Sequence, residues 1–507
     1  MDMERRMDDT VSISKYDTSF GTDVTGDLAL PDYMPEIKRL LYVSSAVLPE
    51  NKFLSGNVLE LSGTLSYCAV YAGEDGSLSS APLVEEYSAD TALPFSPENT
   101  EGIFVDTDIE STSWRATGPR SINIKSRLRF HVVCEEVYEN DDAVIGKDGH
   151  AADISAGIER LTDEFASAIR RRGSITSSVT GEMRAPDGMR PMTCDGTLAV
   201  TTATPDGADV RASGKIVVKC VFAGGGGSNR CVKTEIPFEA SVTVGGDLPF
   251  SDGRAWGRVA SVSVVPADGD DGLYNLNVEY DLEAEAFCRV KATLCTDAYS
   301  TLYETENEWR ECDIPDVVLY GSKRLDVSGE TDLKGESDEQ TPLFVAPASC
   351  QLSTAVSDGK IWASGAVRAR VLVNSAGETV SYEIDIPVKC ELGDAPEGMT
   401  PQEMQSCVSC STVDGSARVD KGKLKVDMDL LISYAVSEKK KVKFVSAVTL
   451  KDRSESDPVP CIKVYYPERD ESVWSICRRY RADRSKLVKN NDFDGDVAAA
   501  GKPVIIL

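Results

Sequence analysis

The residue types that most often perform chemistry are few in this chain and poorly spaced for it. Its two histidines are His131, in an alternating apolar run, and His150, in a polar stretch. Nothing brings them together, so we expect neither a histidine-based triad nor a zinc site with several histidine ligands. Cys407 and Cys410 form a CxxC pair without a second pair at metal-site spacing or an adjacent βαβ pattern. We expect ordinary thiols there, with a metal or redox site as the alternative.

The glycine run Gly224–Gly227 has the composition of a phosphate-binding loop but not its ending. A P-loop continues with Lys and Ser or Thr, whereas Ser228 and Asn229 follow here. Because the run joins two strand-like segments, it predicts a hairpin turn. Carboxylates are abundant everywhere, so pairs of them identify no general acid or base without geometry. No enzyme signature remains, and we expect a non-enzymatic protein without a metal or other cofactor.

Residues 461–507 are the one stretch whose pattern indicates a binding module. Ile462–Tyr466 is apolar and β-prone, which predicts a strand, and Ser472 stands where a helix N-cap belongs. A helical stripe and an arginine face follow, then a short helix over 484–490 and a closing strand over 503–506. The stripe is Val473, Ile476, Cys477 and Tyr480, and the opposite face, expected to be exposed, carries Arg478, Arg479 and Arg481.

This strand–helix–helix–strand order, with the segments ESVWSICRRY, SKLVKNN and GKPVIIL, resembles a LysM domain. LysM domains bind N-acetylglucosamine-containing glycans between two loops, which the resemblance places at 470–473 and 491–497. The family's glycine falls on Asp470, which argues against a close approach of the backbone to a sugar. Trp474 could be a contact residue, although its helical position favours the core. The candidate partner- or glycan-binding residues are Arg469, Asp470, Glu471, Ser472, Val473, Trp474, Arg478, Arg479, Asn490 and Asn491.

The charge of the chain is concentrated outside this module. The formal net charge is −29, and residues 461–507 hold nine Lys and Arg against seven Asp and Glu, which leaves −31 for residues 1–460. An acidic body of this size repels nucleic acid and anionic membranes, and it fits solubility or a basic protein partner. The length of 507 residues suggests about three to four domains.

The beginning of the chain, MDMERRMDDTVSISKY, is charged and lacks the apolar segment of a secretory signal. No window approaches 18 consecutive apolar residues, so we expect no membrane insertion. The protein is therefore expected to stay where it is made. In a reducing compartment its fourteen cysteines, among them Cys68, Cys134, Cys220 and Cys288, are expected to be small buried hydrophobes.

An internal repeat organises the rest of the chain. Gly63, Gly214 and Gly365 are 151 residues apart both times, each within a similar segment. This pattern predicts one long half-buried strand in each copy, because apolar residues recur with a period of two. They stand two, four and six positions after each glycine: Leu65, Tyr67 and Ala69; Ile216, Val218 and Cys220; Val367, Ala369 and Val371.

Other landmarks recur in the same order. A second glycine precedes the first by 33 to 37 residues, and alternating runs begin at Ser121, Leu273 and Lys423. We infer a mostly β protein with three tandem sandwich-like or barrel-like domains and a small α+β module. The predicted ranges are 1–148, 174–298 and 299–452 for the domains, 149–173 for a connector and 461–507 for the module.

Two helices are expected in the body. Ile154, Ile158, Leu161, Phe165 and Ile169 form a helical stripe in the connector, with Asp153 as N-cap and Arg170–Arg172 at its end. Such a stripe packs on its own domain or docks a partner helix. A shorter helix is predicted from Pro35.

The segments LPDYMPEI, SGTLSYCAVY and PRSINIKSRL in the first copy resemble the SPOCS domain of bacterial spore coat assembly proteins. Tandem copies before a LysM domain resemble the spore coat morphogenetic proteins of Clostridia. The resemblance implies a non-enzymatic protein in the mother-cell cytoplasm, at the forespore surface. It would bind the stage IV coat basement-layer ATPase and recruit other coat proteins. The alternative is a protein that binds peptidoglycan, with the β domains as a stalk.

Overall fold

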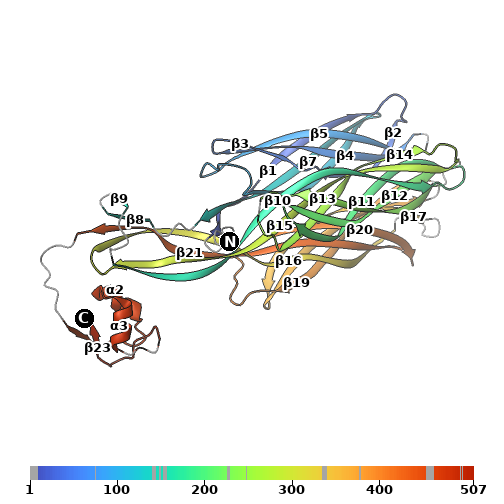
Figure 1. The fold of residues 1–507 in the computed structure, drawn as a ribbon. Coiled ribbons are helices and arrows are strands. Elements are labelled where there is room, and N and C mark those ends of the chain that lie inside the picture. Colours follow the sequence, from blue (N-terminus) through green and yellow to red (C-terminus); the bar gives the residue numbers. More distant parts are fainter. Residues whose placement is uncertain are drawn as a thin grey trace.

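The computed structural model describes residues 10–506 except 75, 140–143, 148–149, 152–156, 225–228, 247, 334–339, 376–377, 453–461, 492 and 494. The described chain is mostly β, as predicted, and contains two short helices. It forms three successive units of long strands and a C-terminal module (Figure 1). We call residues 10–139, 158–300 and 304–451 the first, second and third units, and residues 462–506 the module.

The first unit consists of β1 (Thr10–Ala29), β2 (Ile37–Val47), β3 (Asn51–Ser55), β4 (Val58–Gly73), β5 (Leu78–Ala92), β6 (Ile103–Gly118) and β7 (Ser121–Glu139). Two short strands, β8 (Val144–Lys147) and β9 (His150–Ala151), follow it. The second unit consists of β10 (Ile158–Arg184), β11 (Arg190–Asp206), β12 (Asp209–Ala223), β13 (Asn229–Thr243), β14 (Asp252–Pro266) and β15 (Leu273–Ser300). The third unit consists of β16 (Glu304–Asp332), β17 (Gln340–Ser357), β18 (Lys360–Ser375), β19 (Glu378–Asp394), β20 (Met404–Asp420) and β21 (Lys423–Lys451).

The strands pair in the same order in all three units. The first strand of a unit pairs with the last, and the last pairs with the one before it, as in β10–β15–β14. The remaining strands form a second antiparallel sheet around a central strand, which is β4, β12 or β18. The two sheets of each unit enclose an apolar core that draws side chains from both. Each unit is therefore a two-layer β structure.

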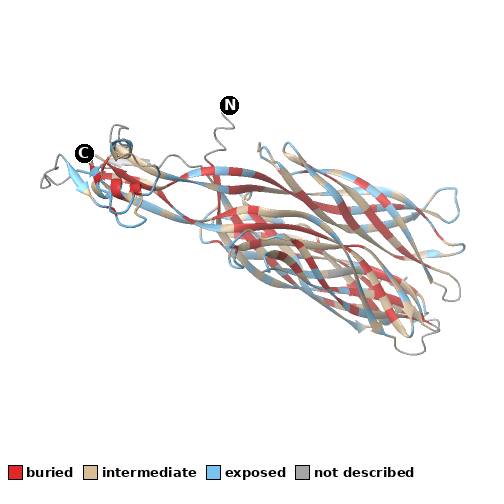
Figure 2. Cartoon of the chain, turned by 90° about the horizontal axis from the view of Figure 1, so that it is seen from below, coloured by how far each residue is buried: buried red, intermediate tan, exposed pale blue. Residues whose placement is uncertain are grey.

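The predicted period of two is confirmed in the central strands. All nine apolar residues that follow Gly63, Gly214 and Gly365 are buried. The glycines themselves lie where a neighbour approaches closely. A Cβ at Gly365 would lie 1.9 Å from the carbonyl oxygen of Gln351 on β17, and one at Gly63 would lie 2.4 Å from the hydroxyl of Tyr87 on β5. Buried and exposed residues alternate along the strands in Figure 2.

Both helices predicted in the body are wrong. Residues 158–169 belong to strand β10, which pairs with β15 over its whole length, so the predicted connector is largely the first strand of the second unit. Asp153 and Ile154 lie outside the described residues. A turn follows Pro31, and Ile37 begins strand β2. Pairing with β15 satisfies the backbone groups of alternate residues along β10, and the long-range sheet outweighs the helical stripe.

The three units share an apolar interior. One cluster combines Tyr42 of the first unit, Val221 of the second and Phe344 of the third. A second cluster combines Ile13, Leu294 and Phe444 from the same three units. The units are therefore not independent domains joined only by linkers, because each buries side chains against the other two.

A cluster of buried charges, the junction cluster, lies where these units meet. It comprises the half-buried Asp106 and the buried Glu135 of the first unit and the buried Arg170, Arg172, Arg254 and Glu285 of the second. Glu285 is central: its carboxylate lies 2.7 Å from Nε of Arg254, 3.4 Å from Nη2 of Arg172 and 3.6 Å from Nη1 of Arg170. Arg254 also donates to the carbonyl oxygen of Cys407 in the third unit. Arg170–Arg172, interpreted as a helix end, thus tie the units together.

The cysteine prediction is wrong for Cys220. It forms a disulfide with Cys194, its register partner on the neighbouring strand β11. Cys134 and Cys288 are buried free thiols, and Cys68 is a half-buried free thiol. Residues 225–227 of the glycine run lie outside the described residues, but the flanking strands β12 and β13 pair antiparallel, as expected for a hairpin.

The long strands of the second and third units continue past the shared interior as an arm, which we define as residues 158–162, 295–309 and 445–451 (Figure 1). An apolar cluster that includes Ala298 and Val448 holds its two strand pairs, β10–β15 and β16–β21, together. The module lies beside the arm. No helix in the described part of the chain is long and apolar enough to cross a membrane.

Candidate functional site

The module has the element order predicted from the sequence. It runs β22 (Lys463–Tyr465), α2 (Val473–Tyr480), α3 (Arg484–Asn491) and β23 (Val504–Ile506), and the two strands pair antiparallel. Ser472 is the N-cap of α2, as predicted, and its hydroxyl accepts a hydrogen bond of 3.1 Å from the amide of Ser475. Val473, Ile476 and Cys477 are buried in the module core, which confirms the helical stripe.

The loop between β22 and α2 presents two free side chains. Arg469 and Asp470 are 92% and 85% exposed, and they contact each other across 3.6 Å. Asp470 has a φ of 61°, in the left-handed region that glycine adopts most easily. The backbone therefore keeps the turn of a glycine although an aspartate occupies the position, and a carboxylate projects from the turn.

Replacing Asp470 with glycine is expected to stabilise the module by about 0.5–1 kcal/mol, because a non-glycine residue is strained in this conformation. Amide hydrogen exchange of α2 in the full-length chain would measure this as slower exchange. Asp470→Ala, which keeps the strain and removes the carboxylate, is the control. Equal exchange in the glycine and alanine variants would contradict the argument.

Glu471 and Arg479 secure the same loop from inside the module. Glu471 accepts hydrogen bonds from the hydroxyl of Tyr465 at 2.8 Å and from the amide of Glu468 at 3.1 Å. Arg479 lies 3.0 Å from the other oxygen of Glu471 and 2.6 Å from the hydroxyl of Tyr465. Glu471 and Arg479, both predicted contact residues, therefore stabilise the conformation of the loop through contacts within the module.

The two loops that the resemblance places beside a groove are joined by their backbones. The amide of Val473 donates to the carbonyl oxygen of Asp496 at 2.8 Å, and the amide of Ala498 donates to Glu471 at 2.9 Å. Asn491 holds the closing strand, since its side chain both donates to and accepts from the backbone of Ile505. Asn490 is exposed.

Trp474 and Arg478 face the arm, and both bind one carboxylate there. The indole Nε1 of Trp474 donates to Oδ2 of Asp297 at 2.8 Å, and Nη1 of Arg478 donates to the same oxygen at 2.6 Å. Trp474 is only 8% exposed, as its helical position favours. Arg478 is exposed, as expected, with 49% of its side chain accessible, but Asp297 on β15 engages its guanidinium.

Three further contacts extend this interface. The hydroxyl of Tyr299 donates to the carbonyl oxygen of Ala482 at 2.7 Å, and its ring packs on that of Trp474 with centroids 5.0 Å apart. Burial raises the pKa of Tyr299, so its hydroxyl stays a donor. Arg481 pairs with Glu304 across 3.2 Å. The module is therefore docked on the arm through one side of α2 and the turn that follows it.

No family model matches this chain, and no curated protein or solved structure matches it either.

The geometry divides the predicted site residues into three groups. Trp474 and Arg478 bind the arm, while Arg469, Asp470 and Asn490 are free on the surface. The others stabilise the module: Glu471, Ser472, Val473, Arg479 and Asn491. Sequence reasoning missed Asp297 and Tyr299. No local signal marks them, because they lie at the end of strand β15, far from the module in sequence.

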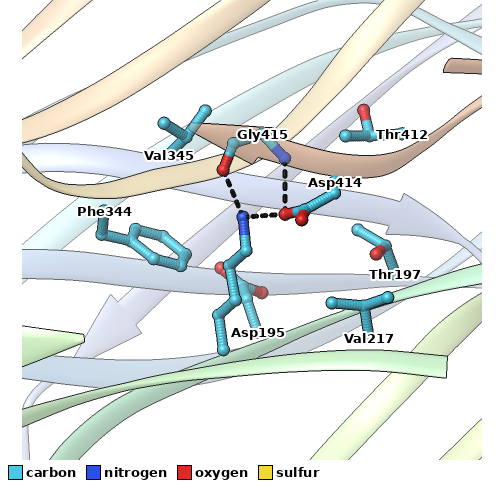
Figure 3. Close-up of a pocket in the computed structure, with 9 residues that line it drawn as sticks. Asp195, Thr197, Val217, Phe344, Val345, Thr412, Asp414 and Gly415 are labelled. Carbon is cyan, nitrogen blue, oxygen red and sulfur yellow. Dashed lines mark hydrogen bonds and ion pairs between the residues drawn. The ribbon is translucent and has the colours of Figure 1, made fainter. Parts of the chain in front are cut away.

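A cavity between the second and third units is a second candidate site (Figure 3). Its one lysine, Lys219 of the second unit, lies 2.5 Å from Oδ1 of Asp414 and donates to the carbonyl oxygen of Gly415. Asp414 and Gly415 belong to the third unit, so these contacts join the second and third units across the cavity. Asp195 accepts a hydrogen bond of 3.1 Å from Tyr42 of the first unit. Burial raises the pKa of Asp195 to about 6, although this hydrogen bond opposes the shift. The polar groups of the cavity connect units and present no free nucleophile.

The raised pKa of Asp195 predicts a pH effect. In the folded protein this carboxyl keeps its proton to about pH 6, whereas in the unfolded chain it loses the proton near pH 4. Its contribution to stability is therefore largest below pH 4 and falls as the pH rises to about 6. We expect Asp195→Asn to be more stable relative to the wild type at pH 7 than at pH 4, by about 1–3 kcal/mol. Urea unfolding at both pH values would measure the difference, and an equal effect at the two would contradict it.

The remaining chemical candidates are separated in space. Cys407 and Cys410 lie on strand β20, where residues three apart point to opposite faces. Cys407 faces Arg172 of the junction cluster, and Cys410 packs in the core of the third unit. His131 lies 2.8 Å from Asp17, and the side chain of His150 is outside the described residues. The CxxC pair therefore cannot hold one metal ion with both sulfurs.

Proposed function

We propose that this protein is a non-enzymatic scaffold that presents its C-terminal module, at a defined place on a β body, to a protein partner. The observation that carries this proposal is the docking of the module on the arm, where Asp297 binds both Trp474 and Arg478. A module that only tethered a stalk would need no such contact. The three units bury side chains against one another, which provides a rigid base.

We further propose that the three units are copies of one domain related to the SPOCS domain, and that the module is a LysM domain. The common strand pairing of the units and the strand–helix–helix–strand order of the module support this assignment. It implies a role in spore coat assembly at the forespore surface, with the stage IV coat basement-layer ATPase as the partner of the module and other coat proteins as partners of the units. The Cys194–Cys220 disulfide opposes a location in the reducing mother-cell cytoplasm.

The free side of the module limits where such a partner can bind. Because Trp474 and Arg478 face the arm, the partner would contact the loop of Arg469 and Asp470 and the exposed Asn490. Exposed charges at the edge of an interface change the rate of association and its dependence on salt.

One observation favours the second candidate function, the binding of N-acetylglucosamine-containing glycans such as peptidoglycan. The left-handed conformation at Asp470 keeps the turn that the LysM resemblance assigns to a glycine. The carboxylate at this position opposes the close approach of a sugar to the backbone.

Binding to the purified basement-layer ATPase and to insoluble peptidoglycan would separate the two functions. The scaffold proposal expects the full-length protein to bind the ATPase, a chain ending at Lys451 to lose binding, and Arg469→Glu to weaken it by about three- to tenfold. Lys486→Glu, an exposed charge on α3, is the matched control and should have little effect. Retention on peptidoglycan that depends on the module, without ATPase binding, would overturn the scaffold proposal.

A further inference from the structure

The outer face of the β22–β23 sheet carries an unusual set of exposed apolar side chains. Val464 is 57% exposed, its cross-strand neighbour Ile505 is 42% exposed, and Ile462 and Tyr466 are 63% and 62% exposed. Ile462, Val464 and Tyr466 alternate along the chain, so they share one face of an extended segment. Burial of such side chains is favourable in proportion to their area, which makes this face suited to contact with another surface.

The two edges of this small sheet differ. On the β23 edge, the amide of Ile505 donates to Oδ1 of Asn491, and Nδ2 of Asn491 donates to the carbonyl oxygen of Ile505. This side chain replaces a neighbouring strand, so the β23 edge is closed. Because the amide and carbonyl of Ile505 point away from β22, the Val464–Ile505 pair is of the non-hydrogen-bonded kind.

The same geometry leaves the β22 edge open. In a non-hydrogen-bonded antiparallel pair both residues direct their amide and carbonyl groups outward, so those of Val464 point away from β23. Within the described chain, β23 is the only strand that pairs with β22. An edge with unpaired backbone groups and exposed apolar side chains is a template for another strand.

We propose that this edge pairs with the β22 edge of a second copy, in an antiparallel arrangement centred on Val464. The two sheets would form one sheet in the order β23–β22–β22–β23. The edge is complementary to itself: Val464 would face Val464 of the second copy, and Ile462 would face Tyr466. β-branched and aromatic residues are favourable cross-strand partners. On the other face, Lys463 would face Tyr465 of the second copy.

A second copy fits this edge for a physical reason. A two-fold axis through Val464 satisfies the same backbone groups on both chains with one contact, as closed dimers do. The acidic body would weaken the association at low salt, whereas the module itself carries a small positive charge. Five residues from each chain make a small interface, so the dimer should be weak. This inference does not depend on the proposed function.

Analytical ultracentrifugation of the full-length protein at physiological salt, at concentrations up to about 300 µM, tests the proposal. We expect reversible dimerisation that Val464→Lys and Val464→Glu each weaken by about tenfold or more, because like charges would face each other. An equimolar mixture of these two variants should recover association, since opposite charges then meet. This recovery also shows that both variants are folded.

Ile505→Lys is the matched control, because it changes an equally apolar position on the same face of the closed strand. Its dimerisation should stay within about threefold of the wild type. The proposal is overturned if the wild type remains monomeric over the whole range, if the Val464 variants associate as strongly as the wild type, or if Ile505→Lys is as damaging as Val464→Lys.

Discussion

Replacing Asp297 with alanine is expected to release the C-terminal module from the arm. This carboxylate accepts hydrogen bonds from Trp474 at 2.8 Å, Arg478 at 2.6 Å, the amide of Ala298 at 2.9 Å and Asn307 at 3.3 Å. A hydrogen bond to a charged group contributes about 1.5–3 kcal/mol. We expect the docked state to lose about 3 kcal/mol, which shifts the docking equilibrium by about a hundredfold.

Hydrogen exchange of α2 and small-angle X-ray scattering would detect the release as faster exchange and a larger radius of gyration. Glu304→Ala is the control, because it removes only the exposed ion pair with Arg481 and should cost less than about 1 kcal/mol. Arg478→Ala in the Asp297→Ala background should add little, because its partner is already gone. Unchanged exchange and scattering in Asp297→Ala would show that this carboxylate does not hold the module.

Replacing Glu285 with alanine is expected to destabilise the body by about 3–5 kcal/mol, as is typical when one member of a buried charge network is removed. Its side chain is fully buried, and Arg170, Arg172 and Arg254 surround it. Asp106 and Glu135 cannot compensate for three buried guanidinium groups. The shared interior of the units should therefore loosen before the separate cores do.

Denaturant unfolding would measure the loss, with Glu283→Ala as the matched control on the same strand. Glu283 is 21% exposed and lies 3.7 Å from Arg258, so its loss should cost less than about 1 kcal/mol. If both variants lose the same stability, the junction cluster is not what holds the units together.

The lowered pKa of Glu285 also predicts that the body loses stability at acidic pH. Burial alone would raise the pKa of Glu285, but Arg254, Arg172 and Arg170 lower it to about 2. A carboxyl group with a lowered pKa contributes its full stability above about pH 4.5 and loses it as the pH falls toward 2. Glu285→Gln should remove part of this acid dependence, so its stability should change less than that of the wild type between pH 4.5 and 2.

Because the module is docked on the arm, a substitution in the module can affect either docking or the binding of a partner. Loss of function in Trp474 or Arg478 variants would report on docking to the arm, since both bind Asp297. Arg469 is the cleaner probe of an external partner, because its contact is with the adjacent, equally exposed Asp470. Partner binding and module docking can therefore be tested by different substitutions.

The structural features that depend on only a few neighbouring residues were predicted correctly from the sequence. The alternation after Gly63, Gly214 and Gly365 identified the central strands, because a strand with one buried face must repeat every two residues. The N-cap at Ser472 and the apolar stripe of α2 were predicted because a helix end needs a side-chain acceptor and a buried face.

The residues 158–169 show where such patterns fail. Their stripe fits a helix, yet their environment is β15 on one side and the other units around Ser167–Arg170. Periodicity describes one buried face, and it is lost at Ser167–Arg170, where successive residues are buried on both faces, while Thr162–Glu164 and Ala166 are exposed. The helical interpretation failed because the partners of this strand lie more than 100 residues away.

The sequence by itself determined the β character of the body, the order of elements in the module and the contrast between an acidic body and a slightly basic end, because all three depend on local pattern or composition. The tertiary structure decided how Arg170, Arg172 and Arg254 share Glu285, and that Trp474 and Arg478 bind Asp297 rather than remain available to a partner. These contacts join residues that are distant in the chain. A charged or aromatic side chain has several possible partners, and only the packing of the units selects one.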